Sequence, residues 1–214
     1  EANFEEAKSK LILFCKDYPK DPWFVEKLSN IYVFEKNWND ALRVIEKIKY
    51  TKSKKIKNKI ANLRVLSGKK PLEALKISNE SIHVINESIK YYIDKSNVKK
   101  AAAIIQKNWN KFFCLIMVEN FINYKKKNAS DSLKRYKLIA KVLKNSCKES
   151  DESKLAIAFA AYESSIWGES QKYLNLIPKE NWDKRVIDLY GKLSQKSPKI
   201  RMPNVPNSIK NEPK

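Results

Sequence analysis

Hydrophobic residues recur at helical spacing between Pro22 and Ile48. Leu28 and Tyr32 lie four residues apart, and nine residues after Tyr32 the same spacing begins again with Ala41 and Ile45. Each pair predicts one face of a short helix, with a turn between the two helices. A small residue such as Ala41 lets two antiparallel helices approach closely, because large residues then fill the space around it. The stretch therefore predicts a helical hairpin.

The same pattern returns along the chain. Four small residues each follow an acidic residue, and each has Phe, Trp or Pro three positions earlier: Ala7, Ala41, Ala74 and Ser170. The first three are 34 and 33 residues apart, which is the period of a tetratricopeptide repeat. The spacing falls to 27 or 28 before Ala101 and Ala102, so a turn of helix or loop is missing there. The sequence predicts an all-α fold, a tetratricopeptide-like superhelical array of antiparallel helix pairs.

The periodicity covers nearly the whole chain. Further helices are expected at residues 54–66, 71–79, 82–94, 98–109, 109–123, 132–144 and 183–193, with a helix pair at 152–177. We place one repeat domain at residues 1–194, which starts within the second helix of a pair and is expected to be a fragment of a longer protein. Residues 195–214 are rich in Pro and Lys, have no periodicity and predict a disordered tail.

The chain is strongly basic, with a net charge of +20 from 44 basic and 24 acidic residues. Such a charge attracts nucleic acid or an anionic membrane surface. Nearly all the basic residues are lysines spread along the chain, whereas base readout and phosphate forks prefer arginine. We therefore expect protein partners with an acidic segment and an anionic membrane surface nearby. Nucleic acid is the weaker alternative.

Residues that carry chemistry are sparse. His83 is the single histidine, so neither a multi-histidine metal site nor a haem-attachment motif can be built. The three cysteines form no CxxC pair and the three glycines form no GxGxxG turn. We expect that the protein is not an enzyme and has no catalytic residues, no metal-binding residues and no resident cofactor. Haem binding is kept as an alternative, although the sequence has no set of ligand residues that supports it. The longest apolar run, Phe112–Val118, is too short to span a membrane.

Function is therefore expected on a surface. In helical repeat arrays the first helix of each pair lines the concave face, where a partner segment can lie. By register, the residues predicted to face this groove are Trp23, Glu26, Asn30 and Val33 from the opening pair, Lys59 and Leu63 from the next, and Leu155, Phe159 and Tyr162 from the last. The alternative is that these side chains pack against neighbouring repeats.

Residues 132–177 also resemble the C-terminal half of the HemY family of proteobacterial tetratricopeptide proteins. The similarity is carried by short matches in the family's order, covering roughly residues 4–193: Asp21-Pro22-Trp23, Asn37-Trp38-Asn39-Asp40-Ala41, Lys100 to Ile105 followed by Trp109, Asp131-Ser132-Leu133 with Lys134-Arg135, Glu152-Ser153, and Ile166-Trp167-Gly168-Glu169.

The resemblance to HemY implies a bacterial inner-membrane protein with N-terminal transmembrane helices before Glu1, and a soluble repeat domain on the cytoplasmic side. It also implies a link to a late step of haem (porphyrin) biosynthesis, distinct from the flavin-dependent protoporphyrinogen oxidase of the same name. The expected function is a non-enzymatic protein–protein interaction scaffold. A haem- or porphyrin-binding carrier or sensor is the alternative, and a nucleic-acid-binding array is the weaker one.

Overall fold

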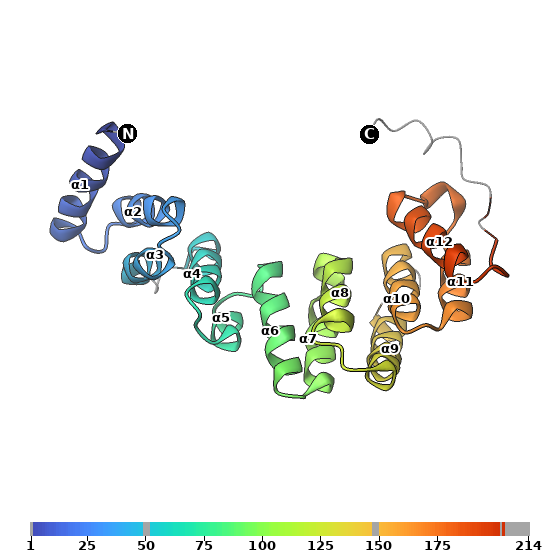
Figure 1. Cartoon of the computed structure of the whole chain (residues 1–214). Helices are drawn as coiled ribbons and strands as arrows, with labels where there is room; N and C mark the ends of the chain where they lie inside the picture. The colour runs from blue at the N-terminus through green and yellow to red at the C-terminus, as the bar shows by residue number, and fades with distance from the viewer. Residues whose placement is uncertain (1, 49–51, 147–149, 202, 204–214) are drawn as a thin grey trace. The chain divides into compact units, whose positions relative to one another are not determined.

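The computed structural model describes residues 2–48, 52–146, 150–201 and 203. Within these ranges the chain forms twelve α-helices and two short 3-10 helices, without a β-strand (Figure 1). The chain divides into two compact units, Glu1–Ser88 and Ile89–Lys214, and the boundary falls inside helix α6. The prediction of an all-α fold is confirmed.

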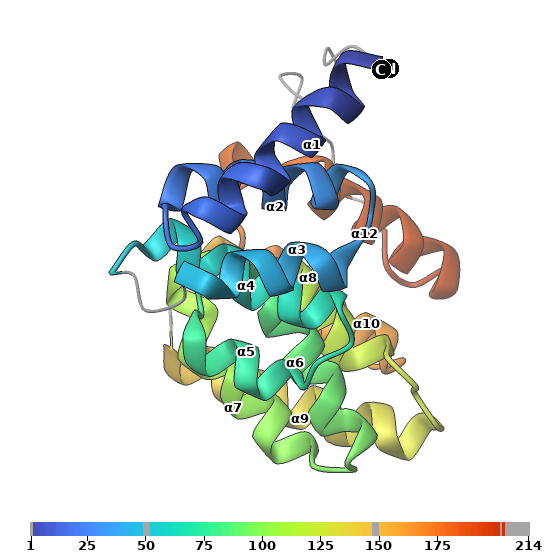
Figure 2. The ribbon, with the colours of Figure 1, turned by 90° about the vertical axis from the view of Figure 1, so that its left-hand side faces the viewer.

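Unit 1 consists of consecutive antiparallel helices. Its elements are α1 (Ala2–Asp17), α2 (Pro22–Phe34), α3 (Trp38–Ile45) with the 3-10 turn η1 (Glu46–Ile48), α4 (Lys54–Leu66), α5 (Pro71–Ile77) and the first part of α6 (Ile82–Asp94). Figure 2 shows α1 against α2, with α3 below α2. The helices α2 and α3 form the predicted hairpin, and α4 and α5 form the next.

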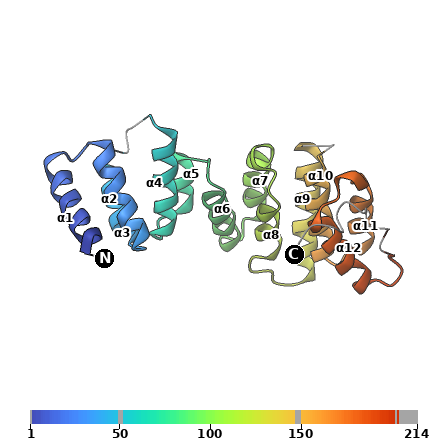
Figure 3. The same ribbon diagram turned by 90° about the horizontal axis from the view of Figure 1, so that it is seen from above.

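Unit 2 continues the same construction. It contains the end of α6, then α7 (Val98–Phe112), α8 (Leu115–Asn123), α9 (Ala129–Ser146), α10 (Asp151–Glu163), α11 (Trp167–Asn175), η2 (Lys179–Asn181) and α12 (Lys184–Lys196). In Figure 3, α8 lies beside α9 and α10 beside α11, and each pair is in contact. None of the described helices combines the length and apolar character needed to cross a bilayer.

One turn geometry closes the hairpins of both units. A residue with positive φ follows the first helix, and the next N–H donates to a carbonyl five residues earlier, as in a Schellman motif. The residues with positive φ are Lys36, Gly68, Ser96 and Ser165, with φ values of 58°, 72°, 55° and 59°. The N–H donors are Asn37, Lys69, Asn97 and Ile166, at 2.8 to 2.9 Å from their acceptors. These bonds satisfy carbonyls that the helix end leaves without a partner.

Small residues lie at the helix crossings, as predicted. Ala41, Ala74, Ala101 and Ser170 are fully buried. Ala7 is exposed, although it has the same register in α1. The reason is that a small residue is covered only where another helix crosses it, and α1 packs on α2 through Leu11, Ile12 and Cys15 instead.

The boundary between two predicted helices, expected at residue 109, lies between Phe112 and Leu115 in the structure. The first, α7, ends at Phe112; Phe113 takes left-handed φ and ψ values of 42° and 47°, and α8 begins at Leu115. The break lets both sides of the stretch enter the core, because Trp109 and Phe121 are fully buried. Neither Gly nor Pro marks the break, and the sequence places the end of the first helix at residue 109, three residues before its observed end.

The end of the chain is only partly described. Helix α12 continues to Lys196, and Ile200 is buried. Residue 202 and residues 204–214 lie outside the described residues, as does Cys147. The disordered tail and the single repeat domain therefore stay predictions.

Candidate functional site

A first surface lies on unit 1, where α2 and α4 are the first helices of successive pairs. Trp23 on α2 is 60% exposed. Its ring meets Phe24 edge-on, with 5.2 Å between centroids, and the Lys27 ammonium lies 5.5 Å from its ring centroid. These two contacts leave most of the indole exposed, so Trp23 can contact a partner.

Hydrogen bonds join α2 to α4 next to this tryptophan. The Lys59 ammonium donates to Asn30 Oδ1 at 2.6 Å and to the backbone oxygen of Glu26 at 3.4 Å. Lys55 Nζ lies 2.7 Å from Glu26 Oε1. Burial lowers the pKa of Lys59 to about 8, while the hydrogen bond from Lys55 lowers the pKa of the Glu26 carboxyl. We call these five residues, Trp23, Glu26, Asn30, Lys55 and Lys59, the α2–α4 surface.

Four of the nine predicted groove residues therefore come together on the α2–α4 surface. Two others do not reach any surface: Leu63 and Leu155 are each 2% exposed. Leu63 belongs to the apolar face of α4 that packs in the core of unit 1, and α10 is buried nearly all round. Val33 is half-buried and packs against the same core as Leu63. The prediction that Leu63 and Leu155 face a partner is wrong, because a helix enclosed by neighbours has more than one buried face.

A second surface lies on unit 2, where α8 and α10 are the first helices of successive pairs. They form an open hollow of about 620 Å³, here called the α8–α10 groove, with Ile116, Asn120, Tyr124 and Phe159 in its lining. Ile116 is 45% exposed and Phe159 is half-buried. Phe159 is the one predicted residue that lines the groove. Tyr162 is half-buried and does not line it.

Charged side chains border the α8–α10 groove. Glu163 lies 3.7 Å from Lys126 Nζ, whereas Glu119 has no ion-pair partner among the described residues. Lys90 lies 5.7 Å from the ring centroid of Tyr124. The groove therefore combines exposed apolar groups with a carboxylate that remains available.

Sequence reasoning missed Ile116 and its neighbours, because residues 109–123 were read as one helix that is apolar almost all round. A finer pattern was present. Glu119, Asn120 and Asn123 are spaced three and four residues apart, which marks one polar face of a helix. Ile116 lies on that same face, four residues before Asn120, and is therefore an apolar residue on the exposed side.

Groups for metal or redox chemistry do not converge in the structure. Across residues 2–48, 52–146, 150–201 and 203, no three His, Cys, Asp or Glu side chains are grouped so as to hold a metal ion. His83 is exposed on α6. Cys15 is buried, and burial raises the pKa of its thiol, which makes it a core residue and not a nucleophile.

No protein-family model matches the chain, and no curated protein matches it. Among solved structures, the crystal structure of the P58(IPK) TPR domain is similar at 14% identity, with a TM-score of 0.32. The match covers 94% of this chain and 63% of that one. The repeats of this chain are defined by recurring hairpins, with Schellman turns and buried small residues. Over its described residues, the chain is an array of antiparallel helix pairs.

Proposed function

We propose that the protein is a non-catalytic scaffold that binds segments of protein partners on the first helices of its repeats. The observation that carries this proposal is the α8–α10 groove, an open hollow with an apolar side chain, Ile116, exposed on its wall. An open hollow of about 620 Å³ admits a few residues of an extended or helical segment, which would bury its apolar side chains against Ile116 and Phe159. Burying these groups supplies the binding free energy.

The two surfaces favour different partner chemistry. In the α8–α10 groove, Glu119 favours a Lys or Arg near the apolar anchor of the bound segment. On the α2–α4 surface, the ammonium groups of Lys55 and Lys59 outnumber the single carboxylate of Glu26. The acidic partner segment expected from the net charge is therefore proposed for the α2–α4 surface and not for the groove.

A matched pair of variants tests the groove. Peptides are first selected from a random display library on the wild-type chain, and their affinities are then measured for Ile116→Lys and Leu176→Lys. Leu176, at the C-terminal end of α11, is 53% exposed and does not line the groove. Both substitutions therefore replace an exposed apolar residue. We expect Ile116→Lys to weaken binding by about tenfold or more, because an ammonium group then occupies the apolar wall. Equal affinity of all selected peptides for wild type and Ile116→Lys would refute the groove.

The finer proposal, that the scaffold is the repeat domain of a HemY-like inner-membrane protein serving haem biosynthesis, is supported by the ordered residue matches alone. It includes N-terminal membrane anchoring outside the sequence described here. Titration with haem and with protoporphyrin separates a scaffold from a tetrapyrrole carrier. A scaffold leaves the Soret band unchanged at micromolar ligand. A saturable Soret shift would favour the carrier instead.

A further inference from the structure

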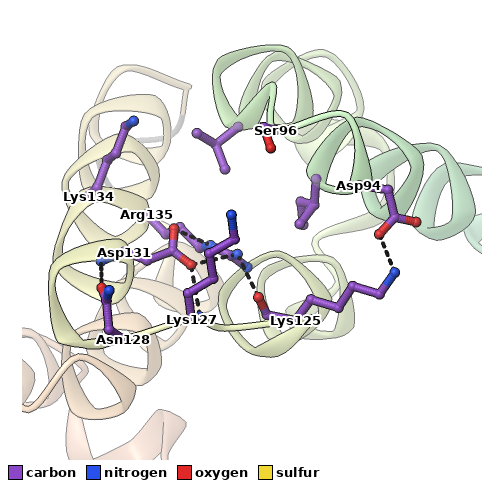
Figure 4. A pocket seen from close by; sticks show the side chains of 10 residues that line it. Asp94, Ser96, Lys125, Lys127, Asn128, Asp131, Lys134 and Arg135 are labelled. Carbon is purple, nitrogen blue, oxygen red and sulfur yellow. Dashed lines mark hydrogen bonds and ion pairs between the residues drawn. The ribbon is translucent and has the colours of Figure 1, made fainter.

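A second hollow in unit 2 lies between the α6–α7 turn and the α8–α9 loop. Its volume is about 340 Å³, and polar side chains from both segments line it: Asp94, Ser96, Lys125, Lys127, Asn128 and Lys134 (Figure 4). It shares no lining residue with the α8–α10 groove. We call it the basic hollow.

A buried arginine holds the loop that forms one wall of the basic hollow. Arg135 on α9 is 2% exposed, and its Nη1 donates to the backbone oxygens of Phe121 and Tyr124 at 2.8 and 2.7 Å. Its Nη2 and Nε donate to the Asp131 carboxylate at 2.8 and 3.1 Å. The backbone N–H of Lys127 donates to Asp131 as well, at 3.2 Å. These bonds fix the loop without using the ammonium groups of Lys127 and Lys134.

Pairing within the basic hollow leaves two positive charges. Asp131 is neutralised by Arg135, and Asp94 Oδ1 lies 2.6 Å from Lys125 Nζ. The ammonium groups of Lys127 and Lys134 have no carboxylate partner among the described residues. Figure 4 draws no bond to the ammonium nitrogen of either lysine. The hollow thus presents a net charge of about +2, concentrated on two exposed lysines at its edge.

Two uncharged donors accompany these lysines. Asn128 caps α9 by accepting the N–H of Asp131 on Oδ1 at 2.9 Å, which leaves its side-chain NH₂ as a donor. The Ser96 hydroxyl comes from the opposite wall, at a turn residue with φ of 55°. The hollow therefore offers ammonium, amide and hydroxyl donors from three segments to one anion.

We propose that the basic hollow binds a phosphate dianion, either inorganic phosphate or the phosphate group of a small phosphate ester. A phosphate monoester carries about −1.5 to −2 charges at pH 7, which matches the two unpaired lysines, and it accepts hydrogen bonds through three oxygens. A monocarboxylate would leave one of the two charges unbalanced. Lysine suits this role as a point charge for phosphate, while Arg135 is committed to the loop.

Calorimetric titration of the full chain tests the proposal. The probes are inorganic phosphate and glycerol 2-phosphate, with sodium acetate and sodium chloride at the same ionic strength as controls. We expect saturable binding of phosphate and none of acetate. The double variant Lys127→Gln/Lys134→Gln should bind at least about tenfold more weakly, since it removes two charged donors. Lys192→Gln, which removes one such charge on the exposed side of α12, should bind within twofold of wild type.

Each outcome decides the proposal. All three variant positions are exposed, so the variants keep the fold, and far-ultraviolet circular dichroism checks this. Tighter binding of glycerol 2-phosphate than of phosphate assigns the hollow to an ester, and equal or weaker binding assigns it to inorganic phosphate. Heat that follows ionic strength alone, or unchanged affinity in the double variant, overturns the proposal. Because the groove and the hollow share no residue, failure here leaves the peptide test unaffected.

Discussion

Replacing Arg135 by methionine tests whether one buried side chain holds the α8–α9 connection. Arg135→Met keeps the length and the apolar stem of the side chain and removes its five N–H donors. The backbone oxygens of Phe121 and Tyr124 then lose their charged donor, and Asp131 loses its ion-pair partner. Each loss acts in the same direction, so the variant should be much less stable than wild type.

The size of the effect follows from the burial of the groups left behind. Removing one partner of a buried ion pair costs about 3 to 5 kcal/mol. The Asp131 side chain is 18% exposed and keeps some hydration, so we expect the lower end, about 3 kcal/mol. Lys134→Met, next to Arg135 but exposed, should change the free energy of unfolding by less than about 0.5 kcal/mol.

The pH dependence gives a second readout of the same interaction. Burial raises the pKa of Asp131, but the hydrogen bonds from Arg135 and the Lys127 N–H outweigh burial and hold it below its ordinary value. A carboxyl with a lowered folded-state pKa stabilises the protein above its unfolded-state pKa, and this stability is lost as the pH falls. The difference between wild type and Arg135→Met should therefore shrink below about pH 4.

Urea unfolding, followed by circular dichroism and by tryptophan fluorescence, measures both effects. Coincidence of the two probes is required, because repeat proteins can unfold in steps. A loss of stability below about 1 kcal/mol in Arg135→Met would refute the reasoning. It would mean that water replaces the guanidinium at these carbonyls at little cost.

Three further changes have definite expected outcomes in urea unfolding. Ala41→Leu should cost about 1 to 3 kcal/mol, because Ala41 is fully buried at a helix crossing, whereas Ala7→Leu on an exposed face should be nearly neutral. Lys36→Gly should stabilise by about 0.5 to 1 kcal/mol because φ is 58° there, while Lys57→Gly inside α4 should cost about 1 kcal/mol. The pKa of Lys59 is about 8 in the folded protein, which is below its value of about 10.4 in the unfolded chain. Between these two pH values the unfolded chain binds more protons than the folded protein, so the stability of the wild type rises with pH across this window. Lys59→Met should lose this rise between pH 7.5 and pH 10; an unchanged rise would contradict the burial of Lys59.

One repeat could have been found in the sequence and was not. Asn128, Asp131 and Ser132 have the same spacing as Asn37, Asp40 and Ala41. In the structure both asparagines cap a helix, accepting the aspartate N–H at 2.9 and 3.2 Å. Ser132 is buried like Ala41, so it is the small residue of the α8–α9 pair. The pattern was visible as an N-cap three residues before an acid.

Other features depend on contacts that a sequence pattern does not contain. The hairpin turns require a residue with positive φ, and only Gly68 is of a type that indicates this in the sequence. The helices on either side hold Lys36, Ser96 and Ser165 in the same conformation. Phe113 likewise turns left-handed without a glycine, since the helices around it are both buried. Tertiary packing supplies the free energy that these residues need to leave their preferred conformation.

The sequence by itself determined the helices and their pairing, because both depend on local periodicity: α4 and α6 have the predicted boundaries, and the small residues lie at the crossings. It also placed Trp23 and Lys59 on one surface, because residues on first helices share a register. Only the tertiary structure decided which exposed side chains face a hollow. The basic hollow joins Asp94 to Lys125, 31 residues apart, through a loop that the buried Arg135 holds in place. Burial and charge pairing are properties of neighbours in space, and the spacing of residues along the chain does not specify them.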